Sequence, residues 1–306
     1  MKEQPRPKGP RATDSRGKRG GSGVAPVKAP PPSAEPLRVS RFLAGAGVAS
    51  RRHADDLIER GRVQVNGHVA ALGEKVTPGT DRVAVDGREV QVKEELVYIM
   101  LNKPPGYLST CSDPFDRKTV LLLLTGVSAR VFPVGRLDLD SDGLLLLTND
   151  GDLAYLLTHP KHHVVKEYLV EVLGEKIVKK IKDMLSGIVV DGKKIEVDYA
   201  KLLEPRRPRW LDERGQGKSR PVVPDAGAVQ GPPRILIGVH EGEKHLVRNV
   251  CRTVGLRVRR LTRTRMGPLQ LGDLPQGKWR YLKDEEVTAL YDDACKVREG
   301  EYDAER

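Results

Sequence analysis

The sequence predicts an α+β protein with two globular domains: a small N-terminal one, and a larger one with a large, mainly antiparallel sheet flanked by helices. Three observations support this prediction. Helical spacing of apolar residues gives way near residue 61 to short alternating segments. Asn-Gly and Asp-Gly pairs, the usual turns of hairpins, follow several of those segments. Further helical patterns lie between the strand-like segments of the second half.

Composition and charge favour a polyanionic partner. Over 306 residues, 53 Lys and Arg outnumber 42 Asp and Glu, which gives a formal net charge of +11. Many nucleic-acid-binding proteins have such a balance, although lysine-rich solvated surfaces produce it too. The three cysteines are far apart, which predicts a reducing compartment and no structural metal. Without an apolar run of membrane-spanning length or a signal-peptide core, we expect a cytoplasmic protein that does not bind membranes.

Residues 1–36 are rich in Pro, Gly, Ser, Lys and Arg and have almost no large apolar side chain. Such a segment cannot bury enough apolar surface to offset the entropy lost on ordering, so we expect a disordered basic tail. The tail would serve either as a solubilising extension or as an electrostatic tether to RNA, and its composition suits both roles equally.

The small domain is predicted over residues 37–92. A short first helix is expected to begin at Leu37, and a second over residues 51–60, with Ser50 as its N-cap and Gly61 at its C-terminal stop. Two pairs of alternating valines then lead into an Asn-Gly and an Asp-Gly turn. The expected unit is therefore two helices followed by hairpins.

Two segments of this domain resemble a known module. They are Arg-Phe-Leu-Ala-Gly-Ala-Gly-Val-Ala-Ser-Arg-Arg-His from residue 41 and Ile-Glu-Arg-Gly-Arg-Val-Gln-Val-Asn-Gly from residue 58. Both are similar to the RNA-binding S4 domain, first seen in a protein of the small ribosomal subunit. In that family, arginines of the second helix and the adjoining loop contact RNA. The resemblance therefore implies RNA binding by Arg41, Arg51, Arg52 and Arg62, whereas the residues alone would also fit a solvated charged helix face.

The larger domain is predicted over residues 96–291. It opens with an apolar run at residues 97–101 that suits a central strand. Further strands are expected at residues 131–134, 144–147, 168–172, 188–190, 195–197 and 235–239, and helices at residues 152–157, 176–185 and 244–254. Residues 205–234 are predicted to form a flexible insertion, in which Trp210 would stack on RNA or, more simply, anchor the loop. Residues 292–306 are expected to be a charged C-terminal tail.

The most informative segment is Gly-Arg-Leu-Asp-Leu-Asp-Ser-Asp-Gly-Leu-Leu-Leu-Leu-Thr-Asn-Asp-Gly, residues 135–151. The carboxylates of Asp138, Asp140 and Asp142 have the spacing of the start of a calcium loop, but the closing glutamate is missing. An acid and base pair for glycoside hydrolysis is the other chemical option. It is disfavoured by the basic scaffold and by the scarcity of aromatic platforms that would hold a sugar.

This segment resembles the signature of the RsuA/RluB/RluE/RluF family of ribosomal RNA pseudouridine synthases. Other motifs of that family follow in the expected order at residues 101–106, 166–168, 241–248 and 266–274. With the N-terminal module, the resemblance covers about residues 37–291. Three positions depart from the family pattern: Ser141 replaces Thr, and Leu246 and Asn249 stand where Gln and Arg are more common.

The resemblance implies that Asp138 is the catalytic carboxylate and that Arg248 is its ion-pair partner and keeps it ionised. Tyr168 would stack on the uracil and take part in proton transfer. Arg136 would bind phosphate or fill the gap left by the extracted nucleotide. A carboxylate suits the reaction, because moving the glycosidic bond from uracil N1 to C5 needs a nucleophile that adds and later leaves. Substrate and product are isomers, so no cofactor is expected.

The substrate is expected to be ribosomal RNA, bound by a monomer. The segment Asp-Pro-x-x-Arg-x-Thr-Val from residue 113 resembles the branch that acts on the large subunit, which favours 23S RNA. Alternating arginines at residues 257–265 would share a strand face, where they would either follow an RNA backbone or be solvated. The alternative function is an RNA-binding ribosome assembly factor without catalysis. Retention of Asp138, Tyr168 and Arg248 argues against it.

Overall fold

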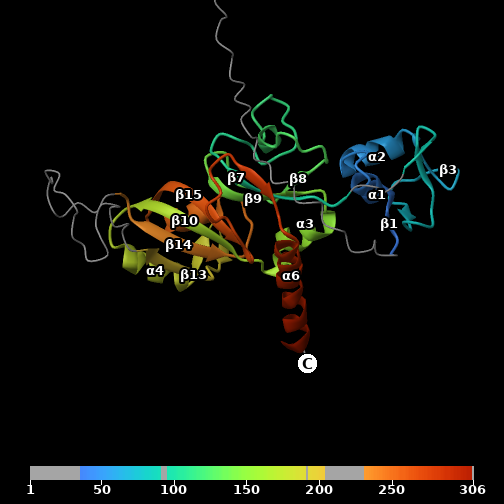
Figure 1. Cartoon of the computed structure of the whole chain (residues 1–306). Helices are drawn as coiled ribbons and strands as arrows, with labels where there is room; N and C mark the ends of the chain where they lie inside the picture. Colours follow the sequence, from blue (N-terminus) through green and yellow to red (C-terminus); the bar gives the residue numbers. More distant parts are fainter. Residues whose placement is uncertain (1–34, 91–94, 191, 204–230, 305–306) are drawn as a thin grey trace, which may run out of the picture.

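The computed structural model describes residues 35–90, 95–190, 192–203 and 231–304. The predicted basic tail and the predicted insertion, with Trp210, therefore lie almost wholly outside the described residues. Figure 1 shows the N-terminal domain, in blue and cyan, at one end of the molecule, and the long sheet of the larger domain extending away from it.

The N-terminal domain packs two helices against short antiparallel strands. The helices are α1 (Val39–Gly45) and α2 (Arg51–Glu59). The strands are β1 (Leu37–Arg38), β2 (Val63–Val65), β3 (His68–Val69), β4 (Lys75–Val76), β5 (Val83–Val85) and β6 (Arg88–Glu89). β1 pairs with β4, and the other four form a sheet in the order β3-β2-β5-β6. The predicted start of the first helix at Leu37 is wrong, because Leu37 pairs with Val76 as a strand residue.

Local signals in this domain are confirmed. The Ser50 hydroxyl accepts a hydrogen bond from the backbone N–H of His53 at 3.2 Å, so Ser50 is the N-cap of α2. Both expected hairpins turn through left-handed residues, with φ of 48° at Asn66 and 52° at Asp86, each followed by a glycine. These positive φ angles match the type of turn that joins two strands with two residues.

A nine-stranded sheet forms the larger domain. Its strands are β7 (Tyr98–Lys103), β8 (Phe132–Val134), β9 (Asp142–Thr148), β10 (Lys166–Leu173), β13 (Tyr199–Leu203), β14 (Arg234–Val239), β15 (Arg257–Met266), β16 (Leu269–Gln270) and β17 (Trp279–Tyr281). The main order is β13-β14-β10-β15-β9-β7-β17, with β16 beside β15 and β8 beside β9. Its described pairings are antiparallel except β9 with β15, so the predicted mainly antiparallel sheet is confirmed.

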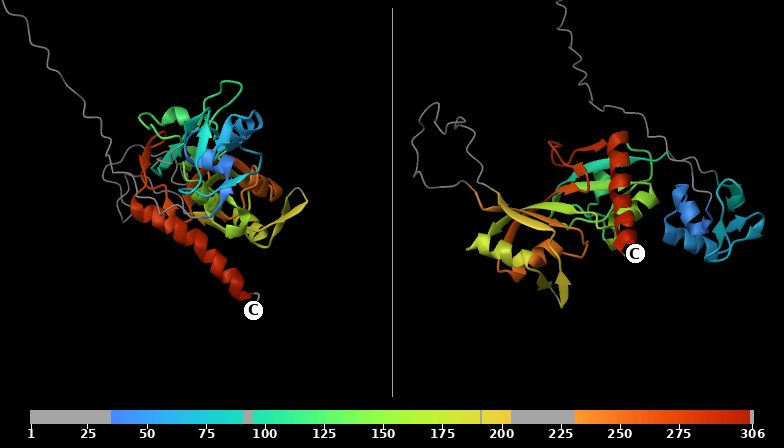
Figure 2. Two further views of the ribbon diagram at one scale, coloured as in Figure 1. Left: turned by 90° about the vertical axis from the view of Figure 1, so that its right-hand side faces the viewer. Right: turned by 90° about the horizontal axis from the view of Figure 1, so that it is seen from below.

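Helices and a separate hairpin complete this domain. They are η1 (Val120–Leu123), α3 (Gly151–Thr158), η2 (Pro160–His162), α4 (Ile177–Leu185), α5 (Leu246–Thr253), α6 (Asp284–Ala304) and the hairpin of β11 (Ile188–Val190) with β12 (Lys193–Ile195). The strand expected at residues 195–197 ends at Ile195 instead, because the hairpin register pairs Ile195 with Ile188. In Figure 2, α6 projects from the body of the molecule and carries the C-terminus at its far end. It extends through the expected charged tail, and Leu290 and Ala294 are buried.

The sheet is joined in its middle by a very short parallel ladder. β9 and β15 pair only at Asp142 with Thr262 and at Gly143 with Arg263. Gly143 has φ of +105°, and a Cβ there would lie 2.3 Å from the Arg263 carbonyl oxygen. Separate apolar cores lie on the two sides of this ladder, and Tyr168 packs against one core on each side. The loop that carries Asp138 leads directly into this junction.

The prediction that alternating arginines of β15 share one face is wrong for Arg263. Arg263 is only 2% exposed, and its Nε donates a 2.7 Å hydrogen bond to the Leu144 carbonyl. Arg260, which that alternation leaves out, binds Asp142, at 2.7 Å between Nη2 and Oδ2. Register shifts between β10 and β15 break the strict alternation on which that prediction depended.

Among the described residues, no helix has the length and apolar character needed to cross a bilayer.

Candidate active site

Asp138 lies in the loop between β8 and β9, and the backbone of this loop is fixed from several directions. The hydroxyl of Ser109 accepts a 3.1 Å hydrogen bond from the Leu137 N–H and donates a 2.9 Å bond to the Leu137 carbonyl. The Gly106 N–H donates to the Leu139 carbonyl at 2.7 Å. These bonds hold the residues on either side of Asp138, whose side chain is 25% exposed. The carboxylate is thus rigidly placed but open to a ligand.

Lys103 holds the backbone of the Asp138 loop through hydrogen bonds from its side chain. Its side chain is fully buried, and Nζ donates hydrogen bonds to three carbonyl oxygens: Pro104 at 3.2 Å, Asp138 at 3.0 Å and Ser141 at 2.8 Å. An ammonium group has three N–H donors, and here each one has an acceptor. Burial lowers the pKa of Lys103 to about 8, against the opposing attraction of Asp142, Asp138 and Asp140. One lysine therefore ties the end of β7 to both ends of the Asp138 turn.

The start of α5 faces the Asp138 carboxylate. His245 precedes the helix with φ of 57°, and its Nε2 lies 3.4 Å from Oδ1 of Asp138. Arg248, one turn later on the same face, places Nε 3.8 Å from Oδ2 of Asp138. Its Nη2 lies 2.9 Å from Oδ2 of Asp140 and 3.3 Å from the Ser141 hydroxyl. Two cation-capable groups and the positive end of a helix therefore attract negative charge at this loop.

The sheet places the remaining predicted residues around this loop. Tyr168 lies on β10 in register with Arg263, whose neighbour on the other side is Gly143. It is half-buried, with its ring packed on apolar residues. Arg136 is exposed and stands two residues before Asp138 in the same loop. Arg248 is thus in contact with the carboxylate, and Tyr168 and Arg136 lie on the elements next to it.

The four predicted RNA-binding arginines differ in their surroundings. Arg51 and Arg52 are exposed at the start of α2. The Nε of Arg62 donates a 2.8 Å hydrogen bond to Asp86. Arg41 forms an ion pair with Asp152 at the start of α3, which links the N-terminal domain to the larger one. The exposed pair on α2 is therefore the part of this set that faces solvent without an ion-pair partner among the described residues.

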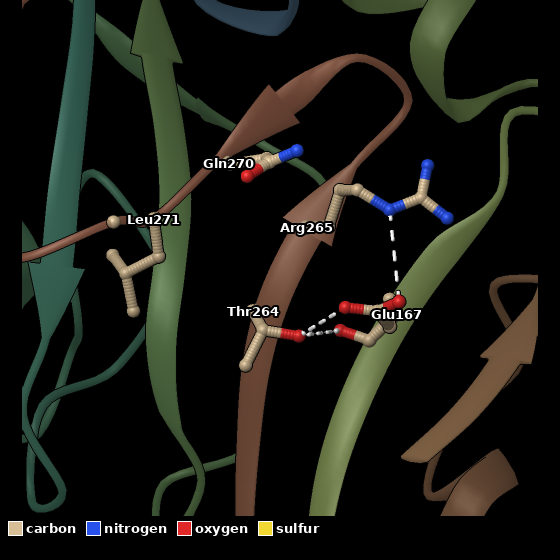
Figure 3. Close-up of a pocket in the computed structure, with 6 residues that line it drawn as sticks. Glu167, Thr264, Arg265, Gln270 and Leu271 are labelled. Atoms are coloured by element: carbon tan, nitrogen blue, oxygen red, sulfur yellow. Dashed lines mark hydrogen bonds and ion pairs between the residues drawn. The ribbon is translucent and has the colours of Figure 1, made fainter. Parts of the chain in front are cut away.

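Two cavities lie away from the carboxylate itself. One of about 300 Å³ is lined by Glu167, Thr264 and Arg265 of the sheet (Figure 3). Its polar groups already bind one another, as in the 2.8 Å hydrogen bond from the Thr264 hydroxyl to Glu167. The other, of about 510 Å³, lies between η2 and the connection from β14 to α5.

Over the part of the chain that the structure describes, no cluster of three or more His, Cys, Asp or Glu would hold a metal ion.

Sequence reasoning missed three residues that the structure places at the site: Lys103, Ser109 and His245. Lys103 and His245 stand inside the quoted motifs. A lysine that ends an otherwise apolar strand was the available signal for Lys103, because a lysine is rarely fully buried without a specific partner. Ser109 and His245 gave no such signal, since their contacts join segments far apart in sequence. The departure at Ser141 keeps a hydroxyl that accepts a hydrogen bond from Arg248.

Comparison with known proteins agrees with this geometry. Residues 97–253 match the family model described as RNA pseudouridylate synthase, and residues 37–83 match the S4 domain. An uncharacterized RNA pseudouridine synthase of Aquifex aeolicus is 42% identical, over 83% of this chain and 94% of its own. Ribosomal large subunit pseudouridine synthase B of Bacillus subtilis is 37% identical, over 83% and 95%. A crystal structure of a pseudouridylate synthase aligns with 83% of this chain and 99% of its own, at 27% identity and a TM-score of 0.52.

Fold, site and relatives together define an isomerase that converts uridine in RNA to pseudouridine, and the chain belongs to the RNA pseudouridine synthase family. Within that family it has an S4 domain ahead of the catalytic domain. Its relatives also include the dual-specificity RNA pseudouridine synthase RluF of Escherichia coli, 35% identical over 83% of this chain and 78% of that protein.

Proposed function

We propose that this protein isomerises one specific uridine of ribosomal RNA, in the large subunit, with Asp138 as the nucleophile. The observation that carries the proposal is the Asp138 carboxylate, fixed by its backbone, open to a ligand and faced by His245 and Arg248. The large-subunit substrate is supported by the names of two relatives, the Bacillus subtilis enzyme and a putative chloroplast enzyme of Arabidopsis thaliana, 34% identical over 84% of this chain and 61% of that protein.

The reaction moves one bond, and Asp138 is placed to mediate it. The Asp138 carboxylate bonds to ribose C1′ as the bond from C1′ to uracil N1 breaks, which frees the uracil as an anion that can turn. C5 of the turned uracil then bonds to C1′ as the carboxylate leaves, and C5 finally loses its proton while N1 gains one, so atoms and charge balance. Arg248 stabilises the carboxylate whenever it carries negative charge. Tyr168 stacks against the uracil, which has to leave its RNA helix to reach Asp138.

RNA is held outside the site by arginines. Arg51 and Arg52 on α2 would bind phosphates of a structured region, since phosphate contacts position an RNA without reading its sequence. Arg41 and Arg62 would join them when RNA phosphates displace their present carboxylate partners, Asp152 and Asp86. Arg136 lies closest to Asp138 in sequence and would hold the phosphate of the flipped nucleotide.

The test is pseudouridine mapping on ribosomal RNA. Cells that lack the gene are rescued with wild-type protein, with Asp138→Asn or with Asp183→Asn, which removes an exposed carboxylate on α4 and serves as a matched control. Loss of one pseudouridine, restored by wild type and by Asp183→Asn but not by Asp138→Asn, is the expected result. An unchanged map would favour an RNA-binding ribosome assembly factor, and a site restored by Asp138→Asn would exclude Asp138 as nucleophile.

A further inference from the structure

The cavity of about 510 Å³ next to η2 has no part in the function proposed above. Its lining includes Thr158, Lys161, His163, Lys193, His240 and residues 241–243. Its volume falls in the range of roughly 300–1,000 Å³ that is usual for pockets that bind small molecules and cofactors. A single nucleotide is a ligand of this size class.

Both walls of this cavity continue into the active site. On one wall, Thr158 approaches the Asp138 loop: a Cβ at Gly135 would lie 3.7 Å from its Cγ2. On the other wall, residues 241–243 lead to His245, whose ring is 3.4 Å from the Asp138 carboxylate. The cavity therefore borders the two segments that carry Asp138 and His245.

Two imidazole rings of the lining form a tilted pair, of which the exposed one, His163, is the candidate to stack with a base. The rings of His163 and His240 have centroids 4.6 Å apart and planes inclined by 35°. His240 is fixed by Asp198, whose Oδ1 lies 2.8 Å from its Nδ1. His163 is exposed and adopts φ of +44°, a conformation rarely taken by residues other than glycine and often kept at functional sites. Bases of unpaired RNA commonly stack on such rings.

The charged groups of the lining favour a nucleotide over a free anion. Lys193 lies between the carboxylates of Glu241 and Glu243, at 3.0 and 2.6 Å. With Lys161, the lining has two lysines and two glutamates, and their formal charges cancel. The carboxylates accept hydrogen bonds from a ribose 2′-hydroxyl or an exocyclic amine. Lys161 remains to attract the phosphodiester.

We propose that this cavity binds one nucleotide of the RNA substrate that flanks the target uridine, with its base stacked on His163. The proposal rests on the function proposed above, because it needs the substrate uridine at Asp138. Binding of this nucleotide makes the enzyme select RNA substrates by the sequence or shape next to the modified position. It also gives the segment 240–243 a role in substrate choice in addition to its connection to His245, which faces Asp138.

The test uses an RNA hairpin centred on the uridine that mapping identifies. Each nucleotide beside this uridine is replaced in turn by an abasic one, and binding is measured for wild type, His163→Ala, His163→Phe and the control Lys182→Ala on α4. Wild type is expected to lose affinity on the order of tenfold at one abasic position, the usual effect of one stacked base. His163→Ala should lose almost nothing at that position, whereas His163→Phe and Lys182→Ala should behave like wild type.

Turnover of the unmodified hairpin by wild type separates the two proposals. Turnover together with the same abasic loss in wild type and His163→Ala would overturn the nucleotide site alone. Absence of turnover on the hairpin and on whole ribosomal RNA would overturn the proposed function, and the nucleotide site with it. Fluorescence of 2-aminopurine at the responsive position gives a second measure. It should be quenched on binding by wild type and not by His163→Ala.

Discussion

Nη2 of Arg248 lies 2.9 Å from Oδ2 of Asp140, so this guanidinium is held mainly by a carboxylate next to the proposed nucleophile. The contact of Arg248 with Asp138 is looser: Nε lies 3.8 Å from Oδ2, beyond hydrogen-bond distance. Nε is buried and has no hydrogen-bond partner among the described residues. A movement of about 1 Å would complete the bond to Asp138. Asp140, with 68% of its side chain exposed, is the partner that RNA would displace.

Asp140→Asn is therefore expected to retain turnover within about tenfold of wild type, whereas Asp138→Asn abolishes it. The first change weakens the hold of Asp140 on Arg248 and leaves the nucleophile in place; the second removes the nucleophile. Single-turnover rates on the mapped hairpin measure both. If Asp140→Asn were as inactive as Asp138→Asn, Asp140 would have an essential role of its own.

Turnover is expected to fall as the pH rises through about 8, the lowered pKa of Lys103. A neutral amine has two N–H donors for three carbonyl acceptors and loses its attraction to the nearby carboxylates, so the Asp138 turn loosens. Lys103→Arg stays charged throughout this range and should lack that alkaline fall, at a lower overall rate. A fall of the same midpoint in Lys103→Arg would assign it to another group.

Destabilisation of the fold by Lys103 does not explain such a fall. The pKa of Lys103 is about 8 in the folded protein and near its ordinary value of 10.5 in the unfolded chain. Between these values the unfolded chain binds more protons, so the contribution of Lys103 to stability increases as the pH rises. The free energy of unfolding in urea, measured at about pH 7.5 and about pH 9, checks the sign of this contribution.

Gly143→Ala is expected to destabilise the protein by about 3 kcal/mol and to abolish turnover. The added Cβ would meet the Arg263 backbone at 2.3 Å in a left-handed conformation, and backbone atoms cannot easily move aside. Gly151→Ala is the control, since a Cβ there has nothing within 4 Å. It should change stability by less than about 1 kcal/mol in the same urea titration. Equal stability of the two variants would contradict the tight junction.

Asp152→Asn is expected to raise RNA affinity by about two- to fivefold without changing the rate of the bound complex. It releases Arg41 from an exposed ion pair, worth at most about 1 kcal/mol, and makes it available to phosphates. Asp183→Asn controls for the loss of one negative charge. Salt should weaken the difference. A lower affinity in Asp152→Asn would instead mean that the pair orients the N-terminal domain for RNA.

Sequence predicted those features that depend on a few adjacent residues. The cap at Ser50 and the turn at Asn66 belong to this class. Features set by pairing between distant segments were not predictable in this way. The carbonyl contacts of Lys103 join β7 to a loop 35 to 38 residues away, and β10 shifts the register of β15. Regular alternation along a strand was the assumption that failed at Arg263.

The two-residue ladder between β9 and β15 makes catalytic competence a late product of folding. The bond from Arg263 to Leu144 closes a stretch of 119 residues, so the chain has to bring its two half-sheets together before the Asp138 loop has its final surroundings. Contacts within the N-terminal domain join segments much closer in sequence, such as Leu37 with Val76, so we expect that domain to fold first. A newly made chain would therefore acquire affinity for RNA before it is able to isomerise a uridine in that RNA.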